Sequence, residues 1–377
     1  MYQKLLAMKK LLLCLCFPLF LNGQLDSIHQ LLGAHLDHTG SAPVHSILFR
    51  VDRVGEAPLV QTGMGWQNQE GKPVNVSQQF RIASITKTFV ATVILQLVEE
   101  KKVKLTDRIA DHLSNHAFLA VDSLHFYQGQ KFAHEISIEH LLSHYSGLAD
   151  IFNDKTSEFF NKVFSNPQQS YSPKSIVELY YDFGLHKEAH FRPGEDFTYS
   201  DMNYVVLGLL IEKLEEQPLA VVLRKRILAP LGMASTYFEF YEEATKKPSL
   251  LHQWYDGQNM STVNTSFDWA GGGLVSNMQD LSTFIRALFD GRLIQSTTLE
   301  RMIQISPTGP YEDPYGLGVY ASTYNGDLYF GHFGFYGSYM GYCPAKKQTL
   351  IYNLSQGNPA FRVKSLMEKL LLLLEED

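Results

Sequence analysis

The spacing of hydrophobic residues divides this chain into strand-like segments near its two ends and helical segments between them. Residues 46–51 and 58–62 have the short apolar pattern of strands, and Gly55 and Pro58 separate them. From Ser84 the period changes, and apolar residues recur at helical spacing as far as Glu100. The pattern therefore predicts two strands followed by a helix that begins at Ser84.

The rest of the chain follows the same division. Helical periodicity falls at residues 25–36, 137–143, 175–181, 203–216 and 219–227. Short aromatic or β-branched segments predict strands at residues 316–320, 328–331, 338–343 and 349–354, before a last helix at 361–374. Because strands at both ends flank helices, we expect an α/β (α+β) fold with one sheet assembled from the two ends and an inserted helical subdomain.

The N-terminal residues differ in composition from the rest of the chain. Three lysines within the first ten residues precede an apolar run from Leu11 to Leu21, and Gly23 follows. A basic start, a short apolar core and a small residue at its end are typical of a secretory signal, so we predict a signal peptide at residues 1–23. The run is short for a bilayer span, and the alternatives are a membrane anchor or a buried helix.

Composition and charge limit the function further. The 377 residues are 45% hydrophobic and 19% charged, which suits a globular protein of one large domain or two subdomains. The formal charge of -7 and the absence of a long basic run argue against a nucleic-acid partner. Of the three cysteines only Cys343 follows the predicted signal, so the exported chain has no disulfide and depends on its core.

Ser84 and Lys87 are three residues apart at the predicted start of a helix. At this spacing the hydroxyl and the amine lie on one face, and a helix start favours developing negative charge. Lysine is protonated in water at neutral pH, but burial or a neighbouring cation would let it take the serine proton. A solvated Ser and Lys at this spacing also arise by chance, so the pair alone is a weak signal.

Two further motifs have the same ambiguity. Tyr199 precedes a predicted helix, where its phenol can pass a proton beside a lysine cation, although a core tyrosine with a bonded hydroxyl is the alternative. His332-Phe333-Gly334 ends a predicted strand, and Gly334 would let a substrate backbone lie against it. The backbone N–H groups of Phe335 and Ser84 would then form an oxyanion hole, whereas the alternative is a histidine in a turn.

In this order the motifs resemble the serine β-lactamase and penicillin-binding-protein superfamily, above all the group of class C β-lactamases, D,D-carboxypeptidases, D-aminopeptidases and related esterases. The resemblance covers roughly residues 47–354. Similar segments are Phe80–Thr88, Lys104–Asp107, Leu141–Leu148, Pro193–Gly194, Tyr199–Tyr204, Leu207–Gly208, Pro230–Met233, Gly271–Gly273 and Asp280–Leu281. The resemblance implies a β-lactamase/transpeptidase-like fold, in which a mainly antiparallel sheet flanked by helices occupies about 24–83 and 270–377 and an all-helical part about 84–269 of one domain at 24–377.

The same resemblance implies roles for individual residues. Ser84 would be the nucleophile, Lys87 and Tyr199 would move protons, and His332 would stand where family members carry Lys or His. Which of Lys87 and Tyr199 is the general base stays open. Asp201, Phe333 and Gly334 would contact the substrate.

Two of these residues depart from the family pattern. Asp201 replaces the usual Asn, and a carboxylate near Lys87 would favour the ammonium form and weaken the base. Phe333 replaces a Thr or Ser, which removes a hydroxyl that binds carboxylates, so we expect weaker recognition of β-lactam or C-terminal carboxylates. An apolar wall of Phe333, Phe335, Tyr336, Tyr339 and Trp269 would replace it, unless Phe333 points into the core.

Two other functions compete with a hydrolase. His140 and His144 have helical ligand spacing, with His134, Glu135 and Asp150 nearby, but no complete His-Glu-x-x-His motif is present. A non-catalytic protein of the same fold that binds cell-wall peptide or β-lactam is the second alternative.

We therefore predict a periplasmic or secreted serine hydrolase without cofactor or metal. It would cleave an ester or amide through an acyl-enzyme on Ser84, as an esterase or D-amino-acid peptidase-like enzyme ahead of a β-lactamase. Its partner would be a small-molecule or peptide substrate, with the cell wall as one source. We expect no nucleic acid and no stable membrane insertion after signal cleavage.

Overall fold

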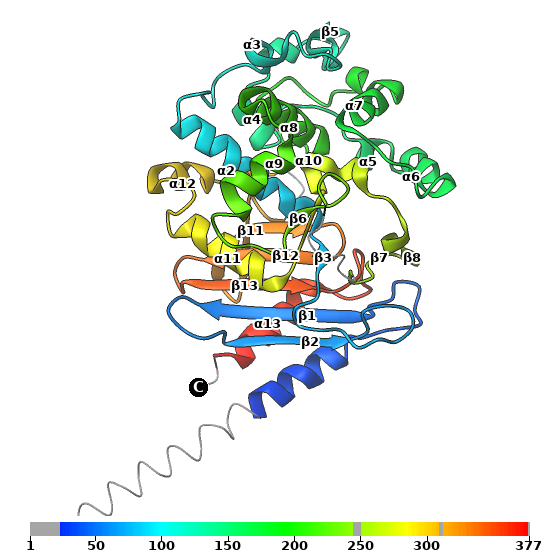
Figure 1. The fold of residues 1–377 in the computed structure, drawn as a ribbon, viewed down its shortest axis with the longest axis vertical. Coiled ribbons are helices and arrows are strands. Elements are labelled where there is room, and N and C mark those ends of the chain that lie inside the picture. Colours follow the sequence, from blue (N-terminus) through cyan, green and yellow to red (C-terminus); the bar gives the residue numbers. More distant parts are fainter. Residues whose placement is uncertain (1–22, 244–249, 309–311, 376–377) are drawn as a thin grey trace, which may run out of the picture.

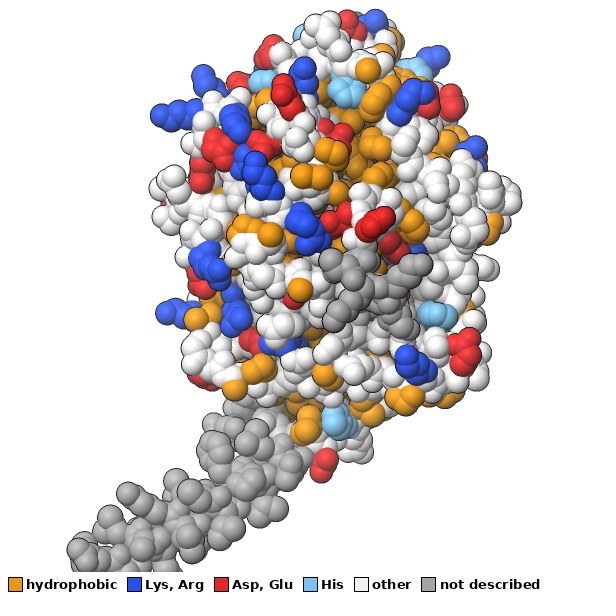
Figure 2. Space-filling view, in the orientation of Figure 1, with side chains coloured by type: hydrophobic (Ala, Val, Ile, Leu, Met, Phe, Trp, Pro, Cys, Tyr) orange, Lys and Arg blue, Asp and Glu red, His pale blue; other side chains and the backbone are white. Residues whose placement is uncertain are grey.

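The structure, a computed structural model, describes residues 23–243, 250–308 and 312–375. The signal peptide predicted at residues 1–23 lies outside the described residues except for Gly23, and residues 23–33 are helical. None of the helices in the described part of the chain is both long enough and apolar enough to cross a membrane. On the face drawn in Figure 2, basic and acidic side chains are interspersed.

A six-stranded antiparallel sheet draws its strands from both ends of the chain (Figure 1). Its order from edge to edge is β10, β11, β12, β13, β1 and β2. The strands are β1 (Ser46–Arg53), β2 (Val60–Gly65), β10 (Tyr320–Tyr324), β11 (Asp327–Gly334), β12 (Ser338–Cys343) and β13 (Gln348–Asn353). The prediction of one sheet built from the two ends is confirmed.

Helices cover both faces of this sheet. Phe49 of β1 belongs to the core formed with residues 23–33 and with α13 (Val363–Leu373), whereas its neighbour Leu48 belongs to the core that includes α11 (Met278–Phe289). Successive side chains of a strand point to opposite faces, so β1 is buried on both sides. This burial explains the continuous apolar run that predicted a strand here.

The remaining helices gather above the sheet in Figure 1, around α2 (Thr86–Glu99) and α8 (Asp201–Glu215). They are α3 (Ile109–Leu113), α4 (Ile138–Leu142), α5 (Ile151–Asp154), α6 (Thr156–Ser165), α7 (Pro173–Asp182), α9 (Leu219–Leu223), α10 (Trp269–Gly272) and α12 (Ser296–Met302). A π-helical segment, Arg224–Leu228, continues α9. The predicted helix at 219–227 thus covers two kinds of helix.

Short strands also occur within the mostly helical region. Strands β4 (Phe126–Tyr127) and β5 (Gln130–Lys131) form one hairpin, and β7 (Trp254–Tyr255) and β8 (Gln258–Asn259) form another. A small sheet has the order β3 (Phe80–Arg81), β9 (Leu274–Ser276) and β6 (Tyr237–Phe238). This small sheet fixes the chain just before Ser84.

One predicted strand begins later than expected. The pattern placed it at residues 316–320, but β10 starts at Tyr320. Gly318 has a φ of +79°, outside the range of a regular strand, and its N–H donates to the Leu142 carbonyl at 3.1 Å. The segment before Tyr320 is therefore a turn that ties the sheet to the end of α4.

Candidate active site

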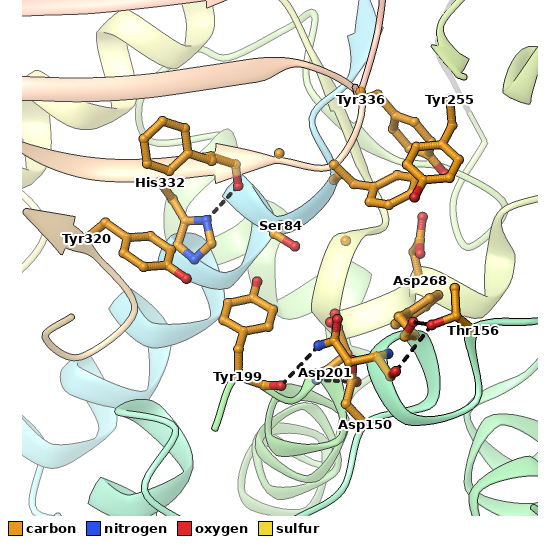
Figure 3. A pocket seen from close by; sticks show the side chains of 18 of the residues that line it. Ser84, Asp150, Thr156, Tyr199, Asp201, Tyr255, Asp268, Tyr320, His332 and Tyr336 are labelled. Atoms are coloured by element: carbon orange, nitrogen blue, oxygen red, sulfur yellow. Dashed lines mark hydrogen bonds between the residues drawn. The ribbon is translucent and has the colours of Figure 1, made fainter. Parts of the chain in front are cut away.

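A pocket of about 570 Å³ holds Ser84 in its wall, between the helical part and the end of β11 (Figure 3). The predicted site residues that line it are Ser84, Tyr199, Asp201, His332, Phe333, Gly334 and Phe335. Lys87 is fully buried behind Ser84. The structure therefore brings all of the predicted site residues together at one pocket.

A tight turn presents Ser84 to this pocket. After β3, the N–H of Ile82 donates to the Leu274 carbonyl at 3.0 Å, and residues 83–85 form a 3-10 turn that leads into α2. Ala83 has a φ of +45°, a strained value for a residue with a side chain. The strain directs the Ser84 side chain into the pocket at the entrance of the helix.

The Lys87 side-chain nitrogen lies within hydrogen-bond distance of three oxygen atoms. Its Nζ is 3.1 Å from the Ser84 Oγ, 2.5 Å from an Asp201 carboxylate oxygen and 2.9 Å from the Gly271 carbonyl. An added Cβ on Gly271 would approach the Asp201 oxygen to 2.4 Å, so this position needs a glycine. Lys87 is thus held as a fixed neighbour of the serine hydroxyl.

Tyr199 lies on the other side of Ser84, just before α8, and its hydroxyl points toward Ser84 (Figure 3). Its ring stacks on His144 with centroids 4.3 Å apart, and the Lys87 Nζ lies 5.0 Å from the Tyr199 ring centroid. Burial, followed by the charge of Asp201, raises the pKa of Tyr199 well above its usual value, while a hydrogen bond with Ser84 opposes the shift. Tyr199 is therefore protonated at neutral pH.

A second carboxylate positions Asp201. The Asp201 N–H donates to Asp150 Oδ1 at 2.9 Å, and the Asn153 N–H donates to Asp150 Oδ2 at 3.1 Å. Asp150 is buried, and burial together with the charge of Asp201 raises the pKa of Asp150 well above its usual value. The start of α8 is thus tied to the start of α5 next to Lys87.

His332 is buried and has both ring nitrogens bonded. Nδ1 lies 2.6 Å from the Phe333 carbonyl, which can only accept, so Nδ1 carries the proton. Nε2 then accepts from the Tyr315 hydroxyl at 3.0 Å. Burial and the nearby Lys87 charge lower the pKa of His332 to about 3, so the ring is neutral at physiological pH.

The next two residues of β11 shape the pocket. Phe333 lines it while its ring also packs against Tyr339 at a centroid distance of 4.7 Å, so both expectations for this side chain hold in part. A Cβ on Gly334 would lie 2.2 Å from the Ile82 carbonyl oxygen. The glycine therefore allows β11 to approach the turn before Ser84. The sequence instead predicted that Gly334 would let a substrate backbone lie against the strand.

Two backbone N–H groups point to a place for an oxyanion. Within the described part of the chain, neither Ser84 nor Phe335 donates its N–H to a protein acceptor. Both residues line the pocket. Free N–H groups on both sides of a nucleophile suit a developing oxyanion.

The predicted aromatic wall is partly wrong. Phe335 and Tyr336 line the pocket, but Tyr339 and Trp269 are fully buried and do not. Tyr339 lies opposite Phe333 in the β11–β12 register, and the rings of Phe333, at 4.7 Å, and Tyr352, at 5.2 Å, pack against it. Aromatic lining residues that the sequence analysis missed are Phe152, Phe160, Tyr255, Phe267 and Tyr320.

Asp268 is a further lining residue that the sequence analysis missed. It directly precedes the Trp269 turn, whose φ of +28° is strained, and it bonds to the Tyr336 hydroxyl. Burial, followed by the charge of Asp201, raises the pKa of Asp268 to about 7. Its only sequence signal is a carboxylate three residues before the glycine-rich segment at 271–273.

The histidines of the metal alternative have other contacts. His140 Nδ1 accepts from the Ser137 N–H at 3.3 Å, and His144 Nδ1 accepts from the Ser200 N–H at 3.1 Å. Asp150 bonds to backbone N–H groups as described above. In the described ranges, no three His, Cys, Asp or Glu side chains come together in a way that would hold a metal.

Comparison with known proteins identifies the family. The Beta-lactamase family profile matches residues 49–374. Protein flp of Staphylococcus aureus (strain NCTC 8325 / PS 47) is 30% identical over 185 residues, which are 48% of this chain and 32% of that protein. The chain thus spans 32% of the length of that curated relative.

Solved structures share the fold. The D-amino acid amidase from Ochrobactrum anthropi SV3, complexed with D-phenylalanine, superposes with a TM-score of 0.76 at 23% identity, over 94% of this chain and 99% of that chain. EstCE1, a hydrolase with promiscuous acyltransferase activity, gives a TM-score of 0.72 at 19% identity, over 95% and 98%. At these identities the likeness shows the fold alone. With the profile match across most of its length, the chain belongs to the β-lactamase family of serine hydrolases.

Proposed function

We propose that this protein is an exported hydrolase that cleaves an ester or amide through an acyl-enzyme on Ser84. The observation that carries the proposal is the contact of 3.1 Å between the Ser84 Oγ and the Lys87 Nζ, made at the wall of a pocket of about 570 Å³. A hydroxyl beside an amine in a pocket of this size is the arrangement expected of an activated serine.

In the proposed reaction the Ser84 oxygen attacks the substrate carbonyl while Lys87 or Tyr199, in its deprotonated form, takes up the Ser84 proton. The backbone N–H groups of Ser84 and Phe335 bind the oxyanion. The tetrahedral intermediate then expels the alcohol or amine, which takes up the proton. Water repeats the sequence on the acyl-enzyme and releases the acid, so the serine is regenerated.

Lys87 and Tyr199 are suited to different steps. Lys87 contacts both the Ser84 hydroxyl and Asp201, so the ammonium formed when it takes up the serine proton has a counter-ion beside it. Tyr199 keeps its proton at neutral pH because its pKa is raised, which suits a donor to the leaving group. His332, neutral and bonded at both nitrogens, positions the end of β11.

The substrate is a small molecule or a short peptide. The Ochrobactrum relative is a D-amino acid amidase, and we extend amide cleavage from it to this chain as part of the proposal. The basic and apolar segment at residues 1–23 supports export to the periplasm or beyond, where cell-wall peptides are one source of such amides.

Labelling with a fluorophosphonate probe tests the proposal. We expect the wild-type protein to be labelled and Ser84→Ala to be unlabelled, with Ser114→Ala as a control because Ser114 is an exposed serine outside the pocket. Folded wild-type protein that resists the probe would contradict the proposal. That result would favour the non-catalytic binding protein.

A further inference from the structure

The walls of the active-site pocket are charged with one sign. Five carboxylates line it, those of Asp150, Asp201, Asp268, Glu312 and Asp313. No lysine or arginine side chain in the described part of the chain lines the same pocket. A substrate that enters therefore meets carboxyl groups and no basic side chain in the lining.

Some of these carboxylates are neutralised by cations outside the lining. Asp201 has Lys87 at 2.5 Å, and Glu312 has Lys364 at 2.8 Å. The other three have neutral partners. Asp150 accepts two backbone N–H groups, and Asp313 accepts the Ser322 hydroxyl at 2.7 Å.

Asp268 lines the pocket next to its aromatic side chains and has no cation bonded to it among the described residues. Its bonded partner is the neutral hydroxyl of Tyr336, and it forms no salt bridge with any described residue. The Arg81 guanidinium already donates to the Glu239 carboxylate at 2.7 and 3.2 Å and to the Met260 carbonyl at 2.7 Å. A cation supplied by a ligand would therefore find an unpaired counter-ion here.

Aromatic rings surround the same part of the pocket. In Figure 3, Tyr255 and Tyr336 lie beside Asp268. Phe335 stacks on Tyr255 with centroids 4.5 Å apart, and Phe160 lies 6.2 Å from Phe335. Ring faces attract ammonium and guanidinium groups, so rings and carboxylate together form a box suited to a cation.

We propose that the acyl part of the substrate carries a positive charge, an ammonium or substituted ammonium group, which binds between Asp268 and the rings of Tyr255, Phe335 and Tyr336. This inference rests on the proposed function, because it places a cationic ester or amide beside Ser84. It also gives a second reason to expect weak recognition of anionic substrates, because a carboxylate would face Asp268.

Two isosteric esters test the proposal directly. The p-nitrophenyl ester of 4-(trimethylammonio)butyrate carries a fixed positive charge, and that of 5,5-dimethylhexanoate has carbon in place of nitrogen. We expect kcat/KM of the wild-type protein to be at least tenfold higher for the cationic ester, and that of the anionic glutarate monoester to be the lowest. Equal values for the two isosteres, or a preference for the neutral one, would overturn the proposal.

Variants locate the effect. Asp268→Asn should lower the ratio of kcat/KM between the cationic and the neutral ester at least fivefold, mainly through KM of the cationic ester. Glu312→Gln is the matched control, because it removes a lining carboxylate that Lys364 already neutralises, and its ratio should stay within twofold of wild type. An unchanged ratio in folded Asp268→Asn, or an equal loss in Glu312→Gln, would reject Asp268 as the counter-ion.

Calorimetry separates this inference from the proposed function. Ser84→Ala should bind phenylalaninamide, a cation, at least tenfold more tightly than neutral N-acetylphenylalaninamide. If the fluorophosphonate labels Ser84 but neither measurement shows a charge preference, only the inference fails. If the probe and all three esters fail to react, the proposed function fails, and calorimetry still decides the charge preference of the pocket.

Discussion

The two walls of the pocket hold their polar groups differently. On the helical wall, Lys87 bonds to both Ser84 and Asp201 beside the pocket, so a proton can move between Ser84 and Lys87. On the β11 wall, the two ring nitrogens of His332 bond to the Tyr315 hydroxyl and to the Phe333 carbonyl, away from Ser84. Gly334 meets the Ile82 backbone.

A side chain can therefore lie close to the nucleophile without taking part in its chemistry. The helical wall has groups whose partners include the Ser84 hydroxyl itself. The β11 wall gives the pocket its shape and supplies the Phe335 N–H. Substitutions on the helical wall should therefore affect kcat most, whereas those on β11 should act through packing and stability.

The largest effect is expected on the helical wall from Ser84→Ala. Loss of the nucleophile should lower kcat for a p-nitrophenyl ester by about 10⁴-fold or more, as for other catalytic serines. The unfolding midpoint in urea should change little, because Ser84 is only partly buried. Retention of more than a tenth of the wild-type kcat would show that another group attacks the substrate.

Lys87→Met should follow, with a loss of about 10²- to 10⁴-fold in kcat, the range of a general acid or base. Methionine keeps most of the buried volume but cannot exchange protons. Lys102→Met is the control, since Lys102 pairs with Glu100 and Glu215 at the surface, and its kcat should stay near the wild-type value. Similar kinetics for the two variants would contradict a role for the helical wall in proton transfer.

On the β11 wall, Gly334→Ala should destabilise the protein by about 1–3 kcal/mol, because a methyl group would overlap the Ile82 carbonyl oxygen. Any displacement reaches Ser84, so kcat should fall by about tenfold in addition. Gly257→Ala is the control, with its nearest contact at 3.4 Å from the Ser41 carbonyl oxygen. Urea unfolding of both variants would show whether the close approach at Gly334 has this energetic cost.

His332→Gln should change kcat by less than about tenfold and leave the pH–rate profile between pH 5 and 8 unaltered. Its effect should appear in stability. The pKa of about 3 lies below the unfolded value, so the unfolded state takes up more protons below pH 6.5 and stability falls as pH falls. Urea unfolding at pH 7 and pH 5 should show the variant losing about 1–2 kcal/mol less than wild type.

The smallest effect is the pH dependence of the proposed charge preference. Asp268, with a pKa of about 7, faces Asp201, Arg81, Lys87, Glu239 and the Tyr336 hydroxyl. It ionises as pH rises, so the ratio of kcat/KM between the trimethylammonio ester and its isostere should grow about fivefold from pH 6 to pH 8. A ratio that is flat with pH would place the cation elsewhere in the pocket.

Sequence patterns predicted much of this arrangement. Helical spacing after residue 84 fixed the relation of Ser84 to Lys87, and strand patterns at both ends predicted the six-stranded sheet. The departure at Asp201 also predicted a carboxylate beside Lys87, which the structure places at 2.5 Å. These features depend on local periodicity or on motifs, which the sequence records directly.

Other features depend on contacts between distant segments. Asp268 and Tyr255 lack a motif, and they line the pocket only because the segment directly before α10, the β7–β8 hairpin and the end of β11 come together there. Tyr339 looked like a lining residue because it follows Phe335 closely, but it pairs with Phe333 across the sheet and is buried against Phe333 and Tyr352. Such placements require the register of the sheet, which the sequence pattern did not supply.

Ser84 should carry the acyl group during turnover. Acid quenching during hydrolysis of p-nitrophenyl 5,5-dimethylhexanoate, followed by peptide mapping with mass spectrometry, tests it most directly. We predict the mass of the acyl group on the peptide that contains Ser84, and its loss in Ser84→Ala. An acyl group on any other residue, or turnover without a covalent intermediate in quench experiments that trap acyl-enzymes of comparable lifetime, would contradict the account.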